Sequence, residues 1–299
     1  MMNGRVRVVE IQAKSILNRA PEGMGFRWTL NPYRGCQHGC VYCYARYTHT
    51  FLNLDPDKDF SQTVFVKTNA VTLLRRELRR PRWRHERVSV GTATDPYQPI
   101  EGRYRLMPGL IQAFGDFYTP FSIVTKNTMV LRDMALLRQV AQRVSVAVLF
   151  SITTVDEALA RELEPDTPSP WQRLRVAQRL ARAGIPAAIA LAPILPGVTD
   201  KPGQLRAVVA AVREHGLSIA FYQPLRLYDD TRPTLFSYLA RRHPQLVAAY
   251  QRGYTRKDPP AAYRESLRER VEAAMREEGG RWFRPPSVQP LQDRLNIEE

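Results

Sequence analysis

The chain has 299 residues, of which 44% are hydrophobic and 24% are charged, as in ordinary globular proteins. No apolar run approaches the roughly 18 residues that a membrane span needs, and the first residues lack the apolar stretch of a secretory signal, so we expect a cytoplasmic protein without a membrane partner. Lys and Arg number 44 against 29 Asp and Glu, a net charge of +15, which favours DNA or RNA as partners but also fits an arginine-rich solvated surface.

Short β-rich runs alternate with helical stretches along most of the chain. We predict strands at Arg27–Asn31, Val64–Lys67, Val88–Thr92, Phe121–Lys126, Val144–Ser151, Ala187–Leu191 and Ile219–Gln223. Helices are predicted at Ala70–Arg80, Pro108–Phe117, Leu131–Gln142, Pro170–Ala183 and Gly203–His215. The alternation indicates βαβ units, and therefore an α/β fold: a partial (β/α) barrel of about six to seven mostly parallel strands.

The pattern divides the chain into three parts. Residues 1–24 form an N-terminal segment and residues 25–228 the barrel core. After about residue 230 the sequence becomes rich in Arg, Tyr and Pro and reads as helix and loop. We therefore expect residues 229–299 to be a C-terminal helical extension packed on the core. The oligomeric state does not follow from these features.

The densest basic cluster runs from Arg75 to Arg87, as RRELRRPRWRHER. Its first half continues a helical pattern, so the cluster can be the solvated face and end of a helix. Alternatively, Trp83 among the arginines can stack on a nucleic-acid base.

Polar residues follow several predicted strands at the points where the strands end. They are Asn31 through Cys43, the Thr92-to-Asp95 segment, the Thr125-to-Asn127 segment and Ser151. Lys67 ends the strand predicted at residues 64–67 and is a further candidate. Ligands of such folds bind beyond the carboxyl ends of the strands, so we expect these groups to face one mouth.

All three cysteines lie within eight residues, as Cys36, Cys40 and Cys43. This concentration argues against a disulfide framework and for metal binding. Zinc would need a fourth ligand, such as His38 or His49. In that alternative the chain is a zinc-stabilised nucleic-acid-binding protein. Three thiolates on a [4Fe–4S] cluster would instead leave one iron open for a substrate or cofactor, and we favour this interpretation.

The Cx3CxxC spacing, with Tyr42 before the last cysteine, resembles the signature of the radical S-adenosylmethionine (SAM) superfamily. The resemblance implies that SAM binds the open iron and that an electron donor such as a flavodoxin or ferredoxin reduces the cluster. SAM then splits into methionine and a 5′-deoxyadenosyl radical that abstracts hydrogen.

The blocks NPYRGCQHGCVYCYAR, GTATDPYQPIEGRYRLMPG, FSIVTKNT and VAVLFSIT resemble the spore photoproduct lyase-like branch, also labelled DNA repair photolyase-like, over roughly residues 25–225. The resemblance implies that Tyr42 lies against the adenine of SAM and that Lys126 contacts its carboxylate. It also implies that Thr94 contacts the cofactor and that Ser151 contacts the ribose. The chemistry of these side chains suits those groups, since an ammonium pairs with a carboxylate and hydroxyls bond to hydroxyls.

One position departs from that branch. Thr92 stands where the lyase has the cysteine that returns a hydrogen atom to the repaired base, and a hydroxyl O–H bond is too strong for this step. We therefore do not expect spore photoproduct lyase activity by that route. Tyr97 and Tyr104 are nearby candidates for a different hydrogen donor.

The block TDPYQPIE contributes Asp95, Tyr97 and Glu101 as candidate substrate contacts. Asp95 or Glu101 could alternatively pair with a guanidinium such as that of Arg34 or Arg103, or brace the loops. The substrate class is open between a nucleic acid and a protein side chain, peptide or small metabolite.

Overall fold

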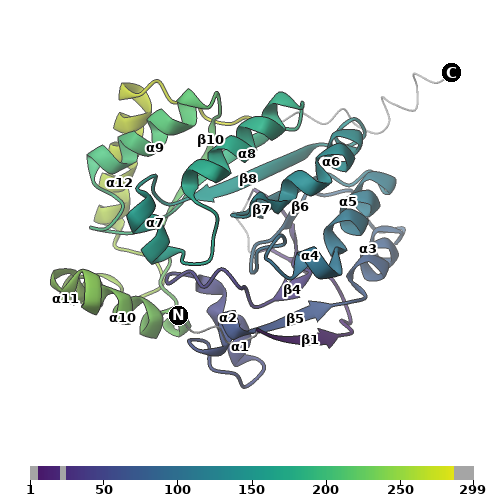
Figure 1. Ribbon diagram of the computed structural model, residues 1–299, viewed down its shortest axis with the longest axis horizontal. Coiled ribbons are helices and arrows are strands. Elements are labelled where there is room, and N and C mark those ends of the chain that lie inside the picture. Colours follow the sequence, from purple (N-terminus) through teal and green to yellow (C-terminus); the bar gives the residue numbers. More distant parts are fainter. Residues whose placement is uncertain (1–5, 21–24, 286–299) are drawn as a thin grey trace.

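The computed structural model describes residues 6–20 and 25–285 (Figure 1). The strands are β1 (Arg7–Ile11), β2 (Leu17–Arg19), β3 (Trp28–Leu30), β4 (Tyr33–Arg34), β5 (Thr63–Lys67), β6 (Val88–Val90), β7 (Phe121–Thr125), β8 (Val146–Ile152), β9 (Ala187–Ile194) and β10 (Ile219–Pro224). The α-helices are α1 (Tyr47–Thr50), α2 (Asp59–Gln62), α3 (Ala70–Leu78), α4 (Glu101–Tyr104), α5 (Leu106–Asp116), α6 (Met134–Ala141), α7 (Glu157–Leu163), α8 (Pro170–Arg182), α9 (Pro202–Glu214), α10 (Arg232–Arg242), α11 (Val247–Gly253) and α12 (Ala261–Glu277). Short 3-10 turns are η1 (Tyr44–Arg46), η2 (Thr128–Asp133), η3 (Asp229–Thr231) and η4 (Pro244–Leu246).

The main sheet has seven strands in the order β10-β9-β8-β7-β6-β3-β2. All neighbouring pairs from β3 to β10 are parallel, and only β2 is antiparallel to its neighbour β3. The order has two ends, so the sheet is an open, partial barrel, with helices packed outside it (Figure 1). Strands β7 and β8 are almost entirely buried, as expected for parallel strands covered on both faces. The predicted α/β partial barrel is confirmed.

The prediction that residues 64–67 belong to this sheet is wrong. Strand β5 lies in a separate three-stranded sheet, parallel to β1 and antiparallel to β4. In the main sheet β3 already has β6 on one side and β2 on the other, so no position beside it is left for β5. Strands β1 and β2 were not predicted, although Val6, Val8 and Val9 give the start of β1 a composition that is typical of a strand.

Helix boundaries follow local sequence signals. Ser169 caps α8 in a capping box with Gln172, Pro170 takes its first position, and Gly184 lies just beyond its end with φ +79°. The helix predicted from residue 131 begins instead with the 3-10 turn η2, which Asn127 caps by accepting a hydrogen bond from the Met129 amide at 2.9 Å. The regular helix α6 follows at Met134.

The C-terminal helices pack on the core at two places. Leu267, Val271, Ala274 and Met275 of α12 join the same buried cluster as the sheet, next to α9. The tyrosines and leucines of α10 and α11 form a second buried cluster that includes Cys40 and Tyr42. Thr231 donates a hydrogen bond to the Cys43 carbonyl at 3.0 Å, so the start of the extension lies against the cysteine loop. The end of the predicted extension, residues 286–299, lies outside the described residues.

None of the helices in the described part of the chain is both long enough and apolar enough to cross a bilayer.

Candidate active site

The three cysteines lie on one loop directly after β4. Gly35 starts the loop with φ +84°, and a Cβ atom there would lie 2.5 Å from the Thr63 carbonyl oxygen, so only glycine fits. The Cys36 amide donates to the Phe60 carbonyl at 3.1 Å. Cys36 and Cys40 are buried, Cys43 is partly buried, and all three thiols are free.

This donor set fits a cluster better than a single metal ion. Burial raises the pKa of all three thiols, that of Cys40 to about 12, so the thiolates that bind metal would need a cationic partner. Within residues 6–20 and 25–285, no three His, Cys, Asp or Glu side chains converge as a single ion requires. The ligands of a cubane do not share one ion, because each thiolate binds a different iron and the three stand around the cluster.

The histidines considered as zinc ligands have other partners. His38 lies with Nδ1 3.4 Å from the Asp95 carboxylate and with Nε2 3.3 Å from the Asn127 amide nitrogen. His49 Nε2 is 3.0 Å from the Thr63 carbonyl oxygen. His38 thus ties the cysteine loop to the ends of two strands, as expected for a residue that supports the loop.

Polar side chains from the block after β6 hold the start of the cysteine loop. Thr94 donates its hydroxyl proton to the Gly35 carbonyl at 2.6 Å, and Gln98 donates to the same carbonyl at 3.2 Å. The Gln98 side-chain oxygen also accepts from the Gln37 amide at 3.0 Å. From the other side the buried guanidinium of Arg46 donates to the Cys40 carbonyl at 3.2 Å. These hydrogen bonds brace the loop from two sides.

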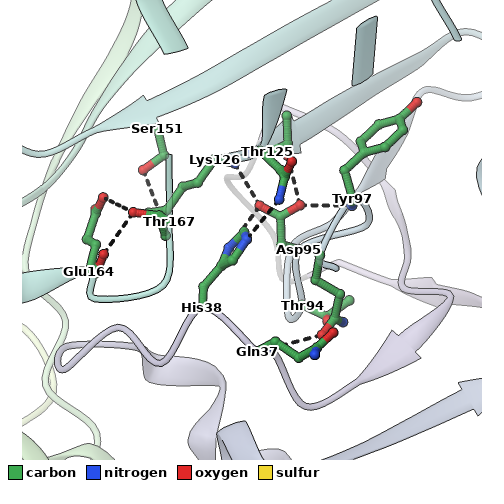
Figure 2. A network of polar contacts seen from close by, with 12 residues as sticks. Gln37, His38, Thr94, Asp95, Tyr97, Thr125, Lys126, Ser151, Glu164 and Thr167 are labelled. Carbon is green, nitrogen blue, oxygen red and sulfur yellow. Dashed lines mark hydrogen bonds and ion pairs between the residues drawn. The ribbon is translucent and has the colours of Figure 1, made fainter. Parts of the chain in front are cut away.

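Asp95 lies at the junction of the strand ends, surrounded by its partners (Figure 2). Its carboxylate accepts hydrogen bonds from the Tyr97 amide at 2.9 Å, the Thr125 hydroxyl at 2.7 Å and the Lys126 amide at 2.7 Å. Together with the contact to His38, these bonds occupy the carboxylate. In this structure Asp95 connects β6, β7 and the cysteine loop.

Lys126, Ser151 and Tyr42 come together at the ends of β7 and β8. The Lys126 ammonium donates to the Ser151 hydroxyl at 3.0 Å, and Ser151 donates to the Ala192 carbonyl at 2.6 Å. The ammonium lies 5.8 Å from the centre of the Tyr42 ring. Burial lowers the pKa of Lys126, but the charges of the Glu164 carboxylate and of a Cys40 thiolate raise it by more. The pKa therefore lies above its ordinary value of 10.5, and the ammonium stays charged.

Glu164 and Arg173 complete this group and were not predicted from the sequence. Glu164 accepts from the Tyr42 hydroxyl and pairs with Arg173, which is fully buried and also donates to the Ser151 carbonyl at 2.9 Å. Burial raises the pKa of Glu164, but the charges of Arg173 and Lys126 outweigh it and lower the pKa to about 2. A buried carboxylate that accepts from Tyr42 and pairs with Arg173 fixes the position of Tyr42, and its charge favours the ammonium form of Lys126. The ELEPDT segment gives no motif for this role, because the partners lie on other elements.

Tyr97 and Glu101 are buried away from this group. The Tyr97 hydroxyl donates to Asp133 at 3.0 Å.

Glu101 accepts from Arg132 at 2.6 Å, from the Leu106 amide at 3.0 Å and from the Tyr33 hydroxyl. Its guanidinium partner is thus Arg132 and neither Arg34 nor Arg103. In the described structure Glu101 connects β4, η2 and the start of α5, and Tyr97 is bonded to η2.

Thr92 lies at the end of β6 next to a different tyrosine from those predicted. The Tyr44 hydroxyl donates to the Thr92 carbonyl, and the Asn31 amide donates to the Thr92 hydroxyl at 3.2 Å. Tyr104 instead donates to Glu10 at 2.6 Å. The ammonium of Lys67 donates to the Asn31 carbonyl at 2.8 Å, so Lys67 is near this side of the mouth even though β5 belongs to the smaller sheet.

The basic cluster from residue 75 onward is the exposed face and end of α3. Trp83 donates to the Thr119 hydroxyl at 2.9 Å, and its ring lies 5.6 Å from that of Trp28. Its indole is thus engaged within the fold and is not presented for base stacking.

Comparisons with known proteins identify the family of the chain. The sequence pattern of the Radical SAM superfamily matches residues 30–206. An uncharacterized protein of Mycobacterium tuberculosis (strain ATCC 25618 / H37Rv) is 44% identical over 266 residues, which cover 88% of this chain and 78% of that protein. One from Methanocaldococcus jannaschii is 29% identical over 201 residues, 67% of this chain and 72% of that protein.

Among solved structures, a spore photoproduct lyase mutant with bound AdoMet and dinucleoside spore photoproduct has a similar fold. The TM-score is 0.66 at 17% sequence identity, over 90% of this chain and 79% of that one. This likeness concerns the fold. Because the superfamily pattern covers more than half of the sequence and includes the cysteine loop, the chain belongs to the radical SAM superfamily.

Proposed function

We propose that this protein is an enzyme that holds a [4Fe–4S] cluster on Cys36, Cys40 and Cys43 and cleaves SAM to abstract hydrogen from a substrate. The observation that carries the proposal is the position of three free thiols in one braced loop, directly beside the Lys126–Ser151 pair. When bound, the reduced cluster supplies the electron that splits the sulfonium of SAM. A flavodoxin or ferredoxin is the expected class of electron donor.

The residues around the loop would hold SAM by ordinary polar and stacking contacts. Lys126 would bind the carboxylate of the methionine part, since its ammonium is charged and has Ser151 beside it. Ser151 would bind the ribose through its remaining lone pair. Tyr42 would lie against the adenine, with its hydroxyl fixed by Glu164.

Thr94 is the fourth proposed cofactor contact. Its hydroxyl proton is used by the Gly35 carbonyl, so it could offer only an acceptor lone pair to SAM. Any contact it makes would therefore be to a donor group of the cofactor. The bond to Gly35 would at the same time keep Cys36 in place.

The residue at the donor position argues against spore photoproduct repair by the lyase route. Thr92 carries a hydroxyl, and its oxygen already accepts from Asn31. All three cysteines of the chain are in the cluster loop, so no thiol remains to return a hydrogen atom. The reaction would therefore end differently from that repair.

We further propose that the substrate is a nucleic acid. The net charge of +15 supports this substrate class, because a positive surface gains from the release of counterions when it binds phosphates. Asp95, Tyr97 and Glu101, which the sequence offered as substrate contacts, would act indirectly by holding the strand ends that form the mouth.

Anaerobic reconstitution with iron and sulfide, followed by dithionite and SAM, tests the proposal. We expect a brown protein that forms 5′-deoxyadenosine, and loss of both properties in variants with any of the three cysteines replaced by alanine. A colourless protein with one bound zinc, or a fully loaded cluster that yields no 5′-deoxyadenosine, would refute it.

A further inference from the structure

A row of aromatic rings lies on the surface beside the cysteine loop. It consists of Tyr44, Tyr228, Tyr47 and Phe51, which we call the aromatic ladder. Successive ring centres are 5.8, 6.1 and 5.9 Å apart. Tyr44 is 38% exposed and Phe51 73% exposed, so the ladder is not core packing. Large exposed aromatic side chains grouped in this way are typical of binding surfaces.

The ladder begins at the mouth of the site. Tyr44 follows Cys43 in sequence, and its hydroxyl donates to the carbonyl of Thr92. Tyr228 is at the other end of the core in the sequence. It is held beside the cysteine loop because Thr231, three residues later, donates to the Cys43 carbonyl at 3.0 Å. From Tyr44 the rings lead outward through Tyr228 and Tyr47 to Phe51. A ligand stacked on the ladder would therefore run from the surface to the mouth.

Cations lie near the ladder from two sides. Burial raises the pKa of the Tyr47 hydroxyl and the charge of Arg34 lowers it, so Arg34 lies near that ring. The pairing of β4 with β5 places Arg34 opposite Phe65, so Lys67, two residues further along β5, shares a face with Arg34. On the other side the Lys257 ammonium lies 5.9 Å from the centre of the Tyr228 ring.

Among the described residues, no carboxylate lies within ion-pair distance of Arg34, Lys67 or Lys257. Burial and the charge of Arg34 lower the pKa of Lys67 to about 8. Two like charges held together in a partly buried place would be stabilised by an anion.

Three acidic side chains near this surface have partners. Asp258 pairs with Arg226 at 3.1 Å, and Asp229 pairs with Arg232 at 3.0 Å. Asp57, near α1, accepts from Thr234 and lies 3.9 Å from Arg46. The surface therefore combines aromatic rings, of which Tyr44 and Phe51 are exposed, with cations that have no carboxylate partner among the described residues.

We propose that the aromatic ladder, with Arg34, Lys67 and Lys257, binds a single-stranded segment of DNA or RNA and leads one nucleotide to the mouth. This proposal rests on the proposed function, since it specifies the substrate of that site. The bases would stack on the rings and the phosphates would pair with the cations. An intact duplex would fit poorly, because its bases are stacked inside the helix and their faces are not available.

Fluorescence anisotropy with the anaerobically loaded protein tests the surface. The probes are labelled oligothymidylate and oligouridylate of about 12 nucleotides, with a DNA duplex of the same length for comparison. We expect the single strands to bind more tightly than the duplex. Replacing Phe51→Ser or Tyr228→Ser should weaken single-strand binding by about 5- to 100-fold, as expected for the loss of one stacked base.

Matched controls separate stacking from general effects. Tyr118 is 44% exposed and lies at the opposite, amino end of β7, with φ +47°, so Tyr118→Asn removes a ring without straining the backbone. Binding by this variant should stay within about twofold. Lys257→Gln should reduce the slope of log affinity against log salt by about 0.7, as for one lost phosphate contact, between about 50 and 200 mM salt.

Equal weakening in Phe51→Ser and Tyr118→Asn, tighter binding of the duplex, or no binding of either single strand at low salt would overturn the proposal. Phe51 is on the surface, so its replacement gives a result even if Tyr228→Ser fails to fold. If 5′-deoxyadenosine forms but the single strands do not bind, only the ladder proposal fails. Single-strand binding without SAM cleavage would refute the proposed function and leave the nucleic-acid surface in place.

Discussion

The ammonium of Lys126 donates a hydrogen bond to the hydroxyl of Ser151 at 3.0 Å, although the two residues are 25 positions apart in the chain. The contact forms because β7 and β8 are adjacent and parallel, so that their carboxyl ends meet at one edge of the sheet. The buried Glu164 carboxylate and Arg173 lie behind this pair. A positive charge is thus held at the place where the proposed SAM carboxylate would bind.

Replacing Lys126 by methionine removes this charge and keeps the length of the side chain. We expect SAM to bind about 10- to 100-fold more weakly, the cost of losing a hydrogen bond to a charged group. Titration calorimetry with the cluster-loaded protein measures the effect. Lys58→Met, at an 83% exposed lysine, is the control and should bind SAM as the unchanged protein does. Equal affinity in both variants would remove Lys126 from the cofactor site.

Glu164→Gln should make the apoprotein less stable at neutral pH by about 3 kcal/mol. The folded-state pKa of about 2 lies below the ordinary value of 4.5, so the stabilisation is complete above about pH 5 and is lost as the pH falls towards 2. The difference in unfolding free energy between the two proteins should therefore shrink over that range in urea titrations. Glu157→Gln, at an exposed position at the start of α7, the helix that ends just before Glu164, should change stability by less than about 1 kcal/mol. A difference that does not change with pH would contradict the predicted ionisation of Glu164.

Gly35→Ala should prevent the cysteine loop from closing correctly. The new Cβ would lie 2.5 Å from the Thr63 carbonyl oxygen in a backbone conformation with φ +84°, so the loop must move. We expect the iron content after reconstitution to fall to less than about half of that of the unchanged protein. Gly203→Ala, in α9, places a Cβ where no atom lies within 4 Å and should keep the iron content. Full iron loading of the Gly35 variant would show that the loop tolerates the shift.

The order of strands and helices in the core could be predicted because periodicity and end signals are local properties. The motif Ser169-Pro170 with Gly184 marked α8 correctly, and six predicted strands lie in the main sheet. The partner of a strand is not a local property. Strand β5 has the composition of a barrel strand, yet it pairs with β1, a segment more than fifty residues earlier.

The candidate site was predictable where one motif carried the chemistry and less so where contacts between distant elements decide a role. The cysteine loop, Lys126 and Ser151 come together as expected from the strand ends. Glu101 looked available in the sequence, but the structure buries it against Arg132 and the start of α5. Glu164 showed no signal, because its partners Tyr42 and Arg173 lie on other elements.

The central claim is that Cys36, Cys40 and Cys43 hold a [4Fe–4S] cluster whose remaining iron is open to SAM. Electron paramagnetic resonance of the reduced, reconstituted protein with and without SAM tests this claim most directly. We expect the signal of a reduced cubane, with a spectrum that shifts when SAM is added and that is absent after any of the three cysteines is replaced by alanine. A protein without iron, or a cubane signal that SAM leaves unchanged, would contradict the claim.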